Sequence, residues 1–278
     1  MRILRVITII MAVVVLVGGG YLFVTSDGMN DAPVLECSVD GIIEATVATT
    51  DQELLSYVKA YDKQDGDLTD KIKVIRKNLF LSVQEKSTLV TFAVCDSDNN
   101  VTNVTRKMVL TDYRSPRISL SYDFIFPSGY TTYKLAQYVS ANDVIDGDLT
   151  SYVKLISSEF SNIEGEYAVN LKVSNSMADT TQVTFNAIVS DEQWFEVKIR
   201  LIDYAAYTTV GQKYDYKAQI ERISYKNKEH EEYRLEDIKI DDSEVDYSKP
   251  GTYNVFYTIG SGDEIVTKTR LLLIVTEG

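Results

Sequence analysis

The motif DGDLT occurs twice in this chain, at Asp65–Thr69 and Asp146–Thr150, and its acidic residues are the first that could do chemistry. Calcium takes hard oxygen ligands, and carboxylate-rich loops of extracellular modules supply them. The candidate calcium ligands, three in each copy, are Asp62, Asp65, Asp67, Asp143, Asp146 and Asp148. Apart from calcium at these loops, we expect no cofactor.

The same loops also fit a structural turn. Their spacing is not that of an EF-hand, because the glycine follows the second acid directly and no glutamate arrives at the distance for bidentate binding. In a turn, the Asp side chains would accept backbone N–H groups, and Gly66 and Gly147 would supply a permissive φ. Leu68 and Leu149 would anchor each loop in the core. We therefore favour the turn over the ion site.

Few other residues suggest chemistry. Cys37 and Cys95 are the only cysteines, and outside the cell they could form a disulfide. The alternative is two unpaired thiols, because Cys95 alternates out of phase with the apolar Phe92 and Val94 and should point away from the core.

The single histidine, His230, lies in the charged run NKEHEEY without a nucleophile motif such as Gly-x-Ser-x-Gly nearby. We expect no catalytic residues and no enzymatic activity.

The DGDLT motif belongs to a much longer repeat. The segment YVKAYDKQDGDLTDKIKVI from Tyr57 matches YVSANDVIDGDLTSYVKLI from Tyr138 at an offset of 138 − 57 = 81. Pro33 and Pro116 open the two copies at similar positions. A fixed period of this length indicates a structural module repeated in tandem. We define module 1 as residues 33–112 and module 2 as residues 115–190.

A third, divergent module covers residues 194–276 and lacks the motif. Its KPGTYNVFYTI segment matches IEGEYAVNLKV of module 2, which places Tyr253 on Tyr167. A Gly-x-Tyr before a late strand is typical of a tyrosine corner, in which the phenol hydroxyl bonds back to the chain. Module 1 has Thr88 at that position, so the corner is predicted for Tyr167 and Tyr253 alone.

Strand signals dominate all three modules. Short runs rich in Val, Ile, Thr, Tyr and Phe alternate with Gly, Asn, Asp and Ser. Units of about 80 residues built from such runs predict tandem β-sandwiches, each of two antiparallel sheets, and so an all-β fold. Because the linkers are short, we expect the modules to stand end to end as a stalk on the order of 100 Å long.

The N-terminus has a different character. Residues 6–24 form an uncharged run of 19 residues, close to the roughly 20 that cross a bilayer as a helix. Arg2 and Arg5 precede the run and Asp27 and Asp31 follow it, so residues 1–5 are predicted to be a cytoplasmic tip. We expect a single-pass protein of the cell membrane with the N-terminus inside and most of the chain extracellular. The alternative is a cleaved signal peptide.

The order of the motifs along each module resembles that of a known family of repeats. DGDLT, an Ile/Val-rich strand, a Gly-x-Tyr strand and a polar turn together resemble the immunoglobulin-like repeat found in tandem on bacterial, especially Gram-positive, surface proteins. The same repeat is appended to some pesticidal crystal proteins. The resemblance is strong for module 2, good for module 1 and partial for module 3. It implies a sandwich that serves as a spacer or adhesive module without catalysis.

Charge narrows the partners. With 41 acidic and 28 basic residues, the net charge of −13 disfavours nucleic acid. We expect a membrane-anchored surface protein whose modules present a binding surface to an envelope polysaccharide or a surface protein. The tyrosine-rich module 3 is where we expect that surface, although no residues are assigned to it. The alternatives are a carbohydrate-binding or cell-wall-associated accessory protein and a calcium-rigidified spacer.

Overall fold

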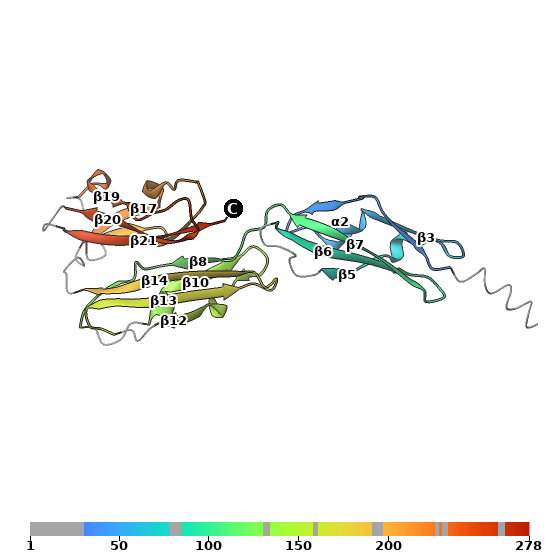
Figure 1. The fold of residues 1–278 in the computed structure, drawn as a ribbon, viewed down its shortest axis with the longest axis horizontal. Coiled ribbons are helices and arrows are strands. Elements are labelled where there is room, and N and C mark those ends of the chain that lie inside the picture. Colours follow the sequence, from blue (N-terminus) through green and yellow to red (C-terminus); the bar gives the residue numbers. More distant parts are fainter. Residues whose placement is uncertain are drawn as a thin grey trace, which may run out of the picture. The chain divides into compact units, whose positions relative to one another are not determined.

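The computed structural model describes residues 31–77, 85–129, 134–157, 161–190, 197–225, 228–229, 233–260 and 265–277. Their regular structure is almost entirely β-strand, which confirms the all-β prediction (Figure 1). The chain divides into two compact units, Met1–Tyr113 and Arg114–Gly278. The predicted cytoplasmic tip and membrane span lie outside the described residues. In the part that is described, no helix is long and apolar enough to cross a membrane.

The first unit contains one two-sheet sandwich, built by module 1. A three-stranded sheet has the order β1 (Val34–Cys37), β3 (Val58–Asp62) and β4 (Gly66–Asp67). A four-stranded sheet has the order β2 (Ile42–Ala45), β7 (Val101–Leu110), β6 (Ser87–Cys95) and β5 (Lys73–Lys77). Helices α2 (Asp51–Leu55) and η1 (Thr69–Lys71) are short connections. Strand β2 runs parallel to β7 and every other pairing is antiparallel among the strands described here.

Side-chain alternation fills the core of this unit. On β6, Val90, Phe92 and Val94 are fully buried, and they point inward as the period of two predicts. Leu54 of α2 is also buried, and the helix begins with a capping box between Thr50 and Glu53. The unit therefore closes a core from its own residues.

The second unit contains two sandwiches. Module 2 has the sheet orders β11-β10-β8 and β12-β13-β14-β9. Its elements are β8 (Arg117–Leu120), β9 (Ile125–Pro127), η2 (Leu135–Tyr138), β10 (Val139–Asp143), β11 (Gly147–Asp148), η3 (Thr150–Tyr152), β12 (Lys154–Ser157), β13 (Gly165–Ser174) and β14 (Thr180–Ser190). The order of strands repeats that of module 1, and β9 again runs parallel to the last strand, β14.

Module 3 has the sheet orders β15-β17-β18 and β16-β21-β20-β19. Its elements are β15 (Val197–Leu201), β16 (Ala205–Thr209), η4 (Tyr216–Gln219), β17 (Ile220–Tyr225), β18 (Lys228–Glu229), η5 (Leu235–Asp237), β19 (Lys239–Asp241), β20 (Gly251–Ile259) and β21 (Thr267–Thr276). Although this module lacks the DGDLT motif, its first two strands, β15 and β16, again lie in different sheets. Strand β16 also runs parallel to the last strand, β21.

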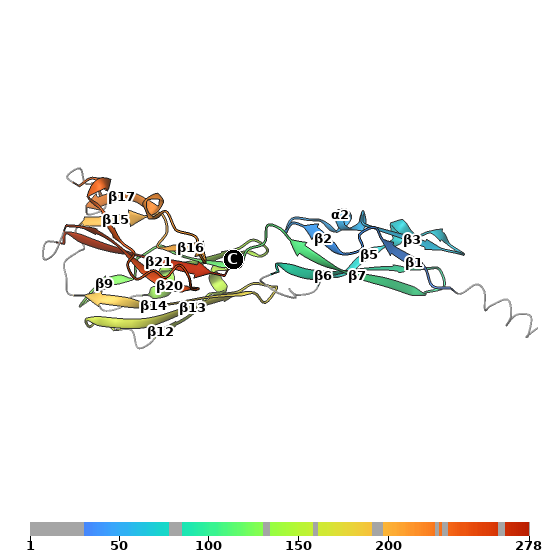
Figure 2. The same ribbon diagram turned by 45° about the horizontal axis from the view of Figure 1, so that its top comes forward.

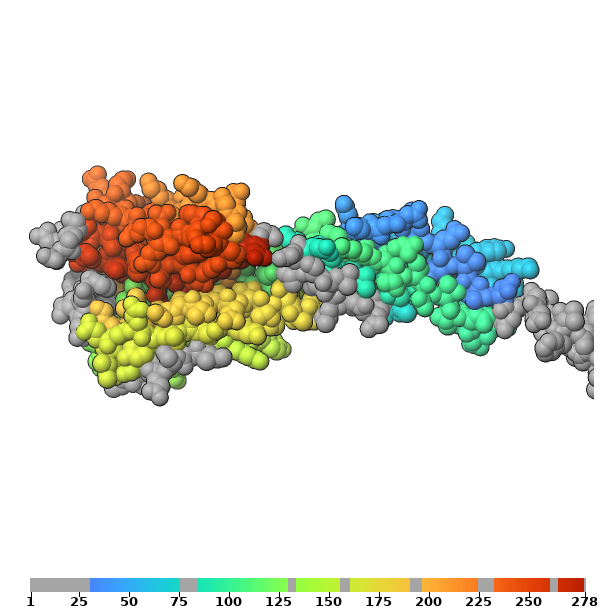
Figure 3. All heavy atoms as spheres, in the orientation of Figure 1, coloured from blue at the N-terminus to red at the C-terminus, as the bar shows by residue number. Residues whose placement is uncertain are grey.

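Modules 2 and 3 lie side by side and share one hydrophobic core (Figures 1 and 2). A single cluster of buried side chains includes residues of both modules, from Ile118 on β8 to Val275 on β21. In the space-filling view, module 3 in orange and red lies directly on module 2 in yellow and green (Figure 3). The end-to-end arrangement expected from the short linkers is therefore wrong for these two modules. A short linker also allows the chain to fold back and bury one sandwich against the next.

Candidate functional site

The DGDLT loop of module 1 is a turn held by its own carboxylates. Asp62 Oδ1 accepts backbone N–H bonds from Gln64 and Asp65 at 2.7 and 2.9 Å. Asp67 Oδ1 accepts from the Thr69 N–H at 2.9 Å. Asp65 accepts from both the N–H and the hydroxyl of Ser97, at 2.6 and 2.7 Å, which ties the loop to the turn after β6.

The second copy repeats these bonds one for one. Asp143 Oδ1 accepts from Ile145 and Asp146, and Asp148 Oδ1 accepts from Thr150. Asp146 accepts from the N–H and the hydroxyl of Ser176 at 2.6 and 2.8 Å. The motif therefore encodes a stapled turn in both modules.

The glycines and leucines of the motif behave as a turn requires. Gly66 and Gly147 have φ values of +77° and +71°, in the left-handed region that side chains disfavour. Leu68 and Leu149 are buried and anchor the loops. The geometry thus accounts for every residue type in the motif.

Calcium binding by these loops stays a prediction. Within the described residues, no group of three or more His, Cys, Asp or Glu side chains is arranged to hold a metal ion. The six candidate carboxylates instead accept hydrogen bonds from the chain. Hydrogen bonds to Thr69 and Thr150 lower the pKa of Asp67 and Asp148, and bonds to Ser97 lower that of Asp65.

The two predicted tyrosine corners are present. The Tyr167 hydroxyl donates to the Ile163 carbonyl at 2.8 Å, and the Tyr253 hydroxyl donates to the Lys249 carbonyl at 3.0 Å. Each ring lies over the glycine two residues earlier, and a Cβ at Gly251 would meet the Tyr253 ring at 3.3 Å. The Gly-x-Tyr pattern is thus a packing requirement as well as a hydrogen bond.

The cysteines lie in different sheets of module 1. Cys37 ends β1 and is half-buried, whereas Cys95 ends β6 and is exposed, and both are free thiols. Of the two alternatives, the structure has the unpaired thiols. The reason is the alternation along β6, which turns Cys95 to the outer face while Val94 points into the core.

The tyrosines of module 3 are mostly part of its interior. Tyr204, Tyr216 and Tyr257 are buried, and the Tyr257 hydroxyl donates to the Tyr216 carbonyl at 2.9 Å. The Tyr216 and Tyr247 hydroxyls share a hydrogen bond of 2.6 Å. Burial raises the pKa of Tyr216 and Tyr257. These side chains stabilise the module, and few tyrosine rings are exposed among its described residues.

Arg270 on β21 is the central side chain of the joint between modules 2 and 3. It is 1% exposed, and its Nη1 donates to the Asn186 carbonyl at 2.6 Å. Its Nη2 donates to the carbonyls of Asp123 at 3.0 Å and Phe124 at 3.5 Å. The guanidinium also lies 5.5 Å from the centroid of the Phe185 ring. A module 3 cation thus satisfies carbonyls that module 2 presents.

Two further ionisable groups lie at this joint. Burial raises the pKa of Asp123, which also accepts a bond from the Ile125 N–H, while Lys198 and Arg270 act in the opposite direction. Burial lowers the pKa of Lys198 and brings that of Arg270 to about 10. Arg270 is therefore a buried cation at neutral pH, and backbone carbonyls of module 2 hold its guanidinium.

Hydrogen bonds to the backbone of β8 complete the joint. The Tyr207 hydroxyl accepts from the Ile118 N–H at 2.8 Å and donates to the Ile118 carbonyl at 3.0 Å. Asp203 accepts from the Leu120 N–H at 2.9 Å, and the Tyr204 N–H donates to the Leu120 carbonyl at 3.0 Å. Module 3 thus pairs the free edge of β8 with side-chain and backbone groups.

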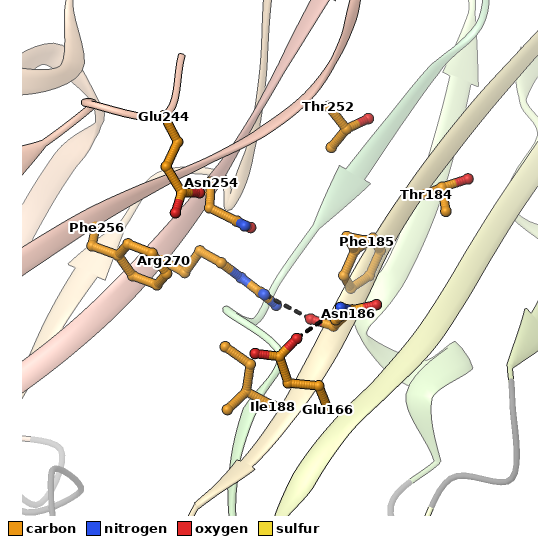
Figure 4. A pocket seen from close by; sticks show the side chains of 10 residues that line it. All are labelled: Glu166, Thr184, Phe185, Asn186, Ile188, Glu244, Thr252, Asn254, Phe256 and Arg270. Atoms are coloured by element: carbon orange, nitrogen blue, oxygen red, sulfur yellow. Dashed lines mark hydrogen bonds between the residues drawn. The ribbon is translucent and has the colours of Figure 1, made fainter.

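A cleft of about 330 Å³ opens beside Arg270, between the outer faces of the two four-stranded sheets (Figure 4). Glu166 of β13 and Asn186 of β14 line one wall, where the Asn186 amide donates to the Glu166 carboxylate at 2.8 Å. Asn254 of β20 and Glu244 from the preceding loop line the other. The cleft is thus lined by side chains of both modules.

The residues of this joint and cleft were not identified from the sequence. Arg270 lies in the strand sequence TKTRLLLIV, where it and Lys268 would both be interpreted as solvent-facing cations. The available signal was the position of Arg270 directly before an uninterrupted apolar run. Its significance depends on module 2 lying against the strand, which the repeat pattern does not reveal.

The sequence matches no protein-family model and no curated protein. Solved structures with similarity include a Clostridium perfringens ZmpB fragment holding the M60 catalytic domain with two CBM51 domains, at 13% identity and a TM-score of 0.23, covering 88% of this chain and 31% of that one. Another is human CDH23 EC21-23, at 9% identity and a TM-score of 0.22, covering 88% of this chain and 100% of that one. The protocadherin GammaB4 extracellular domain matches at 10% identity and a TM-score of 0.20, covering 89% and 49%. This chain thus spans less than half of the ZmpB and protocadherin structures.

Proposed function

We propose that this protein is a non-catalytic, membrane-anchored surface protein in which modules 2 and 3 act as one rigid binding block. The observation that carries the proposal is their shared core, closed by the buried Arg270. A block of this kind holds the surfaces of two sandwiches in a constant relation, as a binding surface built from both requires. Module 1 precedes it as a separate unit and serves as the spacer.

The non-catalytic role is supported by how the buried charges are used. A catalytic acid or base has to reach a substrate atom with its proton-transferring group. The Arg270 guanidinium contacts backbone carbonyls of module 2, and Asp123 accepts from the chain and lies near Arg270 and Lys198. These strongly perturbed groups are committed to joining the modules.

Anchoring is proposed from residues 6–24, whose uncharged run suits a bilayer span. The flanking arginines and aspartates favour an N-in orientation with the rest of the chain outside. The strong acidity, a net charge of −13, suits an exposed extracellular surface.

Cys95 provides a test of the topology, because it is a free and exposed thiol. The full chain is expressed in bacterial cells, and spheroplasts are treated with a membrane-impermeant maleimide before and after lysis. We expect labelling before lysis, and its loss in a Cys95→Ser variant apart from slow reaction at the half-buried Cys37. Labelling that appears only after lysis would contradict the N-in orientation.

Binding to envelopes is tested with soluble protein. The described cores begin after residue 33, so residues 28–278 can be studied in solution. Removing module 3 alone would uncover the core of module 2, so the matched control is residues 28–113, whose core is closed by its own side chains. We expect co-sedimentation of residues 28–278 with isolated bacterial envelopes and none of residues 28–113. Absence of both from the pellet would leave a spacer without a binding role.

A further inference from the structure

The cleft between modules 2 and 3 exists only because the two sandwiches pack side by side. One wall comes from β13 and β14 of module 2, and the other comes from β20 and the loop before it in module 3. Arg270 reaches between the walls at the inner end (Figure 4). Because both walls are sheet faces joined by a shared core, the cleft is preformed and would lose little entropy on binding a ligand.

The walls combine hydrogen-bonding groups with an aromatic side chain. Glu166 and Glu244 offer carboxylate oxygens, which only accept hydrogen bonds, while the Asn254 amide both donates and accepts. The half-buried Phe256 adds apolar surface, although the Lys268 ammonium lies over its ring at 4.1 Å from the centroid. Adjacent hydroxyl groups that donate and accept in turn are complementary to such carboxylates and amides, and C–H groups on one face of a ring pack on an aromatic side chain.

Charge selects against ionic ligands. An anion would face the carboxylates of Glu166 and Glu244 across the cleft. A cation would lie beside the Arg270 guanidinium, which is buried and therefore poorly screened. A ligand without net charge avoids both costs while still satisfying the polar groups.

Size is consistent with a small ligand or the end of a longer one. The cleft volume of about 330 Å³ lies at the small end of the range of roughly 300–1,000 Å³ for ligand pockets. That space suits one or two pyranose rings.

We infer that this cleft binds a neutral sugar unit of an oligosaccharide, with Asn254 and Glu244 as hydrogen-bonding residues and Phe256 as the apolar platform. The inference rests on the proposed binding role of modules 2 and 3, and it names the ligand class for that role. Glu166 holds Asn186 in place by their 2.8 Å hydrogen bond and so acts as a positioning residue on the opposite wall.

Saturation-transfer NMR with residues 28–278 tests the inference. The probes are the neutral disaccharides cellobiose, maltose, lactose and N,N′-diacetylchitobiose, together with spermidine and glucose 6-phosphate as charged probes. We expect millimolar binding of at least one neutral disaccharide and weaker binding of both charged probes. Asn254→Ala and Glu244→Gln should each weaken that binding about tenfold, as the loss of one ligand hydrogen bond does.

The controls separate binding from folding. Asn142→Ala removes an exposed amide on β10, in the other sheet of module 2, and should leave binding unchanged. Glu244 is exposed and Asn254 is half-buried, so their variants should melt at the temperature of the parent protein. Three results would each overturn the inference: no binding of any neutral disaccharide, preference for a charged probe, or binding by both cleft variants that equals that of the parent protein. Envelope binding that persists in these variants would overturn the inference about the cleft while leaving the proposed function intact.

Discussion

Modules 1 and 2 share their motif and strand order, yet equivalent residues have different environments. Asp40 and Asp123 both lie seven residues after the opening proline, since 40 − 33 and 123 − 116 are equal. Asp40 is exposed, whereas Asp123 is buried. Nine residues after the proline, Ile42 is 50% exposed and Ile125 is 1% exposed. The difference arises because module 3 covers this part of module 2.

The comparison shows that a repeat in sequence conserves the inside of a module more strictly than its outside. The stapled DGDLT turns are alike in the two modules, down to the serine that each middle aspartate accepts from. The surface after the first strand differs, because it has become an interface in module 2. Module 3 supplies the complementary groups, Arg270 and Tyr207.

Replacing Arg270 should break this comparison most strongly. In Arg270→Met, the carbonyls of Asn186 and Asp123 lose their buried donor and the Asp123 carboxylate loses a neighbouring charge. We expect a loss of about 3–5 kcal/mol in the unfolding free energy of the second unit, as for other broken buried pairs. Hydrogen exchange read by mass spectrometry should show faster exchange on β14 and β21, while β6 and β7 keep their protection.

Arg106 offers the matched control within module 1. Its Nε donates to the Val39 carbonyl at 3.1 Å in the turn between β1 and β2, but the side chain is only half-buried. Arg106→Met should therefore cost only about 1 kcal/mol, because this bond and the one from Nη1 to the Thr105 carbonyl are both partly exposed to solvent. Equal exchange in β14 of the Arg270→Met and parent proteins would refute the role of Arg270 in the joint.

Tyr207 gives a sharper, pH-dependent test of the same joint. In Tyr207→Phe, the Ile118 N–H and carbonyl both lose their partner, so we expect a loss of about 1–3 kcal/mol in unfolding free energy. Burial raises the pKa of Tyr207 from its ordinary value of 10.0 to about 12. A raised pKa contributes stability that is complete below pH 10.0 and is lost as the pH rises through about 12.

The stability gap between the parent and Tyr207→Phe should therefore be constant up to pH 10.0 and shrink between pH 10.0 and about 12. Urea unfolding at a series of pH values measures it, and other ionisable groups cancel in the difference. A gap that widens over this range would mean that Tyr207 does not hold its proton in the folded joint.

The sequence was a good guide to what lies inside one module. Alternation along β6 predicted that Phe92 and Val94 are buried and that Cys95 is not. The motif predicted the turns, and Gly-x-Tyr predicted both tyrosine corners. These features depend on residues close in sequence or in adjacent strands, so local periodicity and turn chemistry suffice.

Contacts between modules escaped prediction for the opposite reason. The Arg270 Nη2 bond to the Asp123 carbonyl spans 147 residues, and no local pattern specifies a bond of that range. The repeat would even suggest that Asp123 is exposed, because its counterpart in module 1, Asp40, is exposed to solvent. The cleft, which arises from this contact, was equally hidden.

The smallest effect should come from the feature that the two modules share. Hydrogen bonds to Thr69 and Thr150 lower the pKa of Asp67 and Asp148 below 3.8, so these carboxylates contribute stability above that pH and lose it as the pH falls. Asp67→Asn and Asp148→Asn should each lower the melting temperature slightly at pH 7, and the deficit should vanish in acid.

The effect of calcium on the melting temperature tests whether the DGDLT loops are only turns or also bind an ion. If they are, the melting curves of residues 28–278 with calcium and with a chelator will coincide, in the parent and in both variants. A rise in melting temperature with calcium that is smaller in both Asp67→Asn and Asp148→Asn would instead assign an ion to both loops, because binding to the folded state alone stabilises it by mass action. A calcium effect that is smaller in only one of the two variants would show that the copies, although alike in hydrogen bonding, differ in calcium binding.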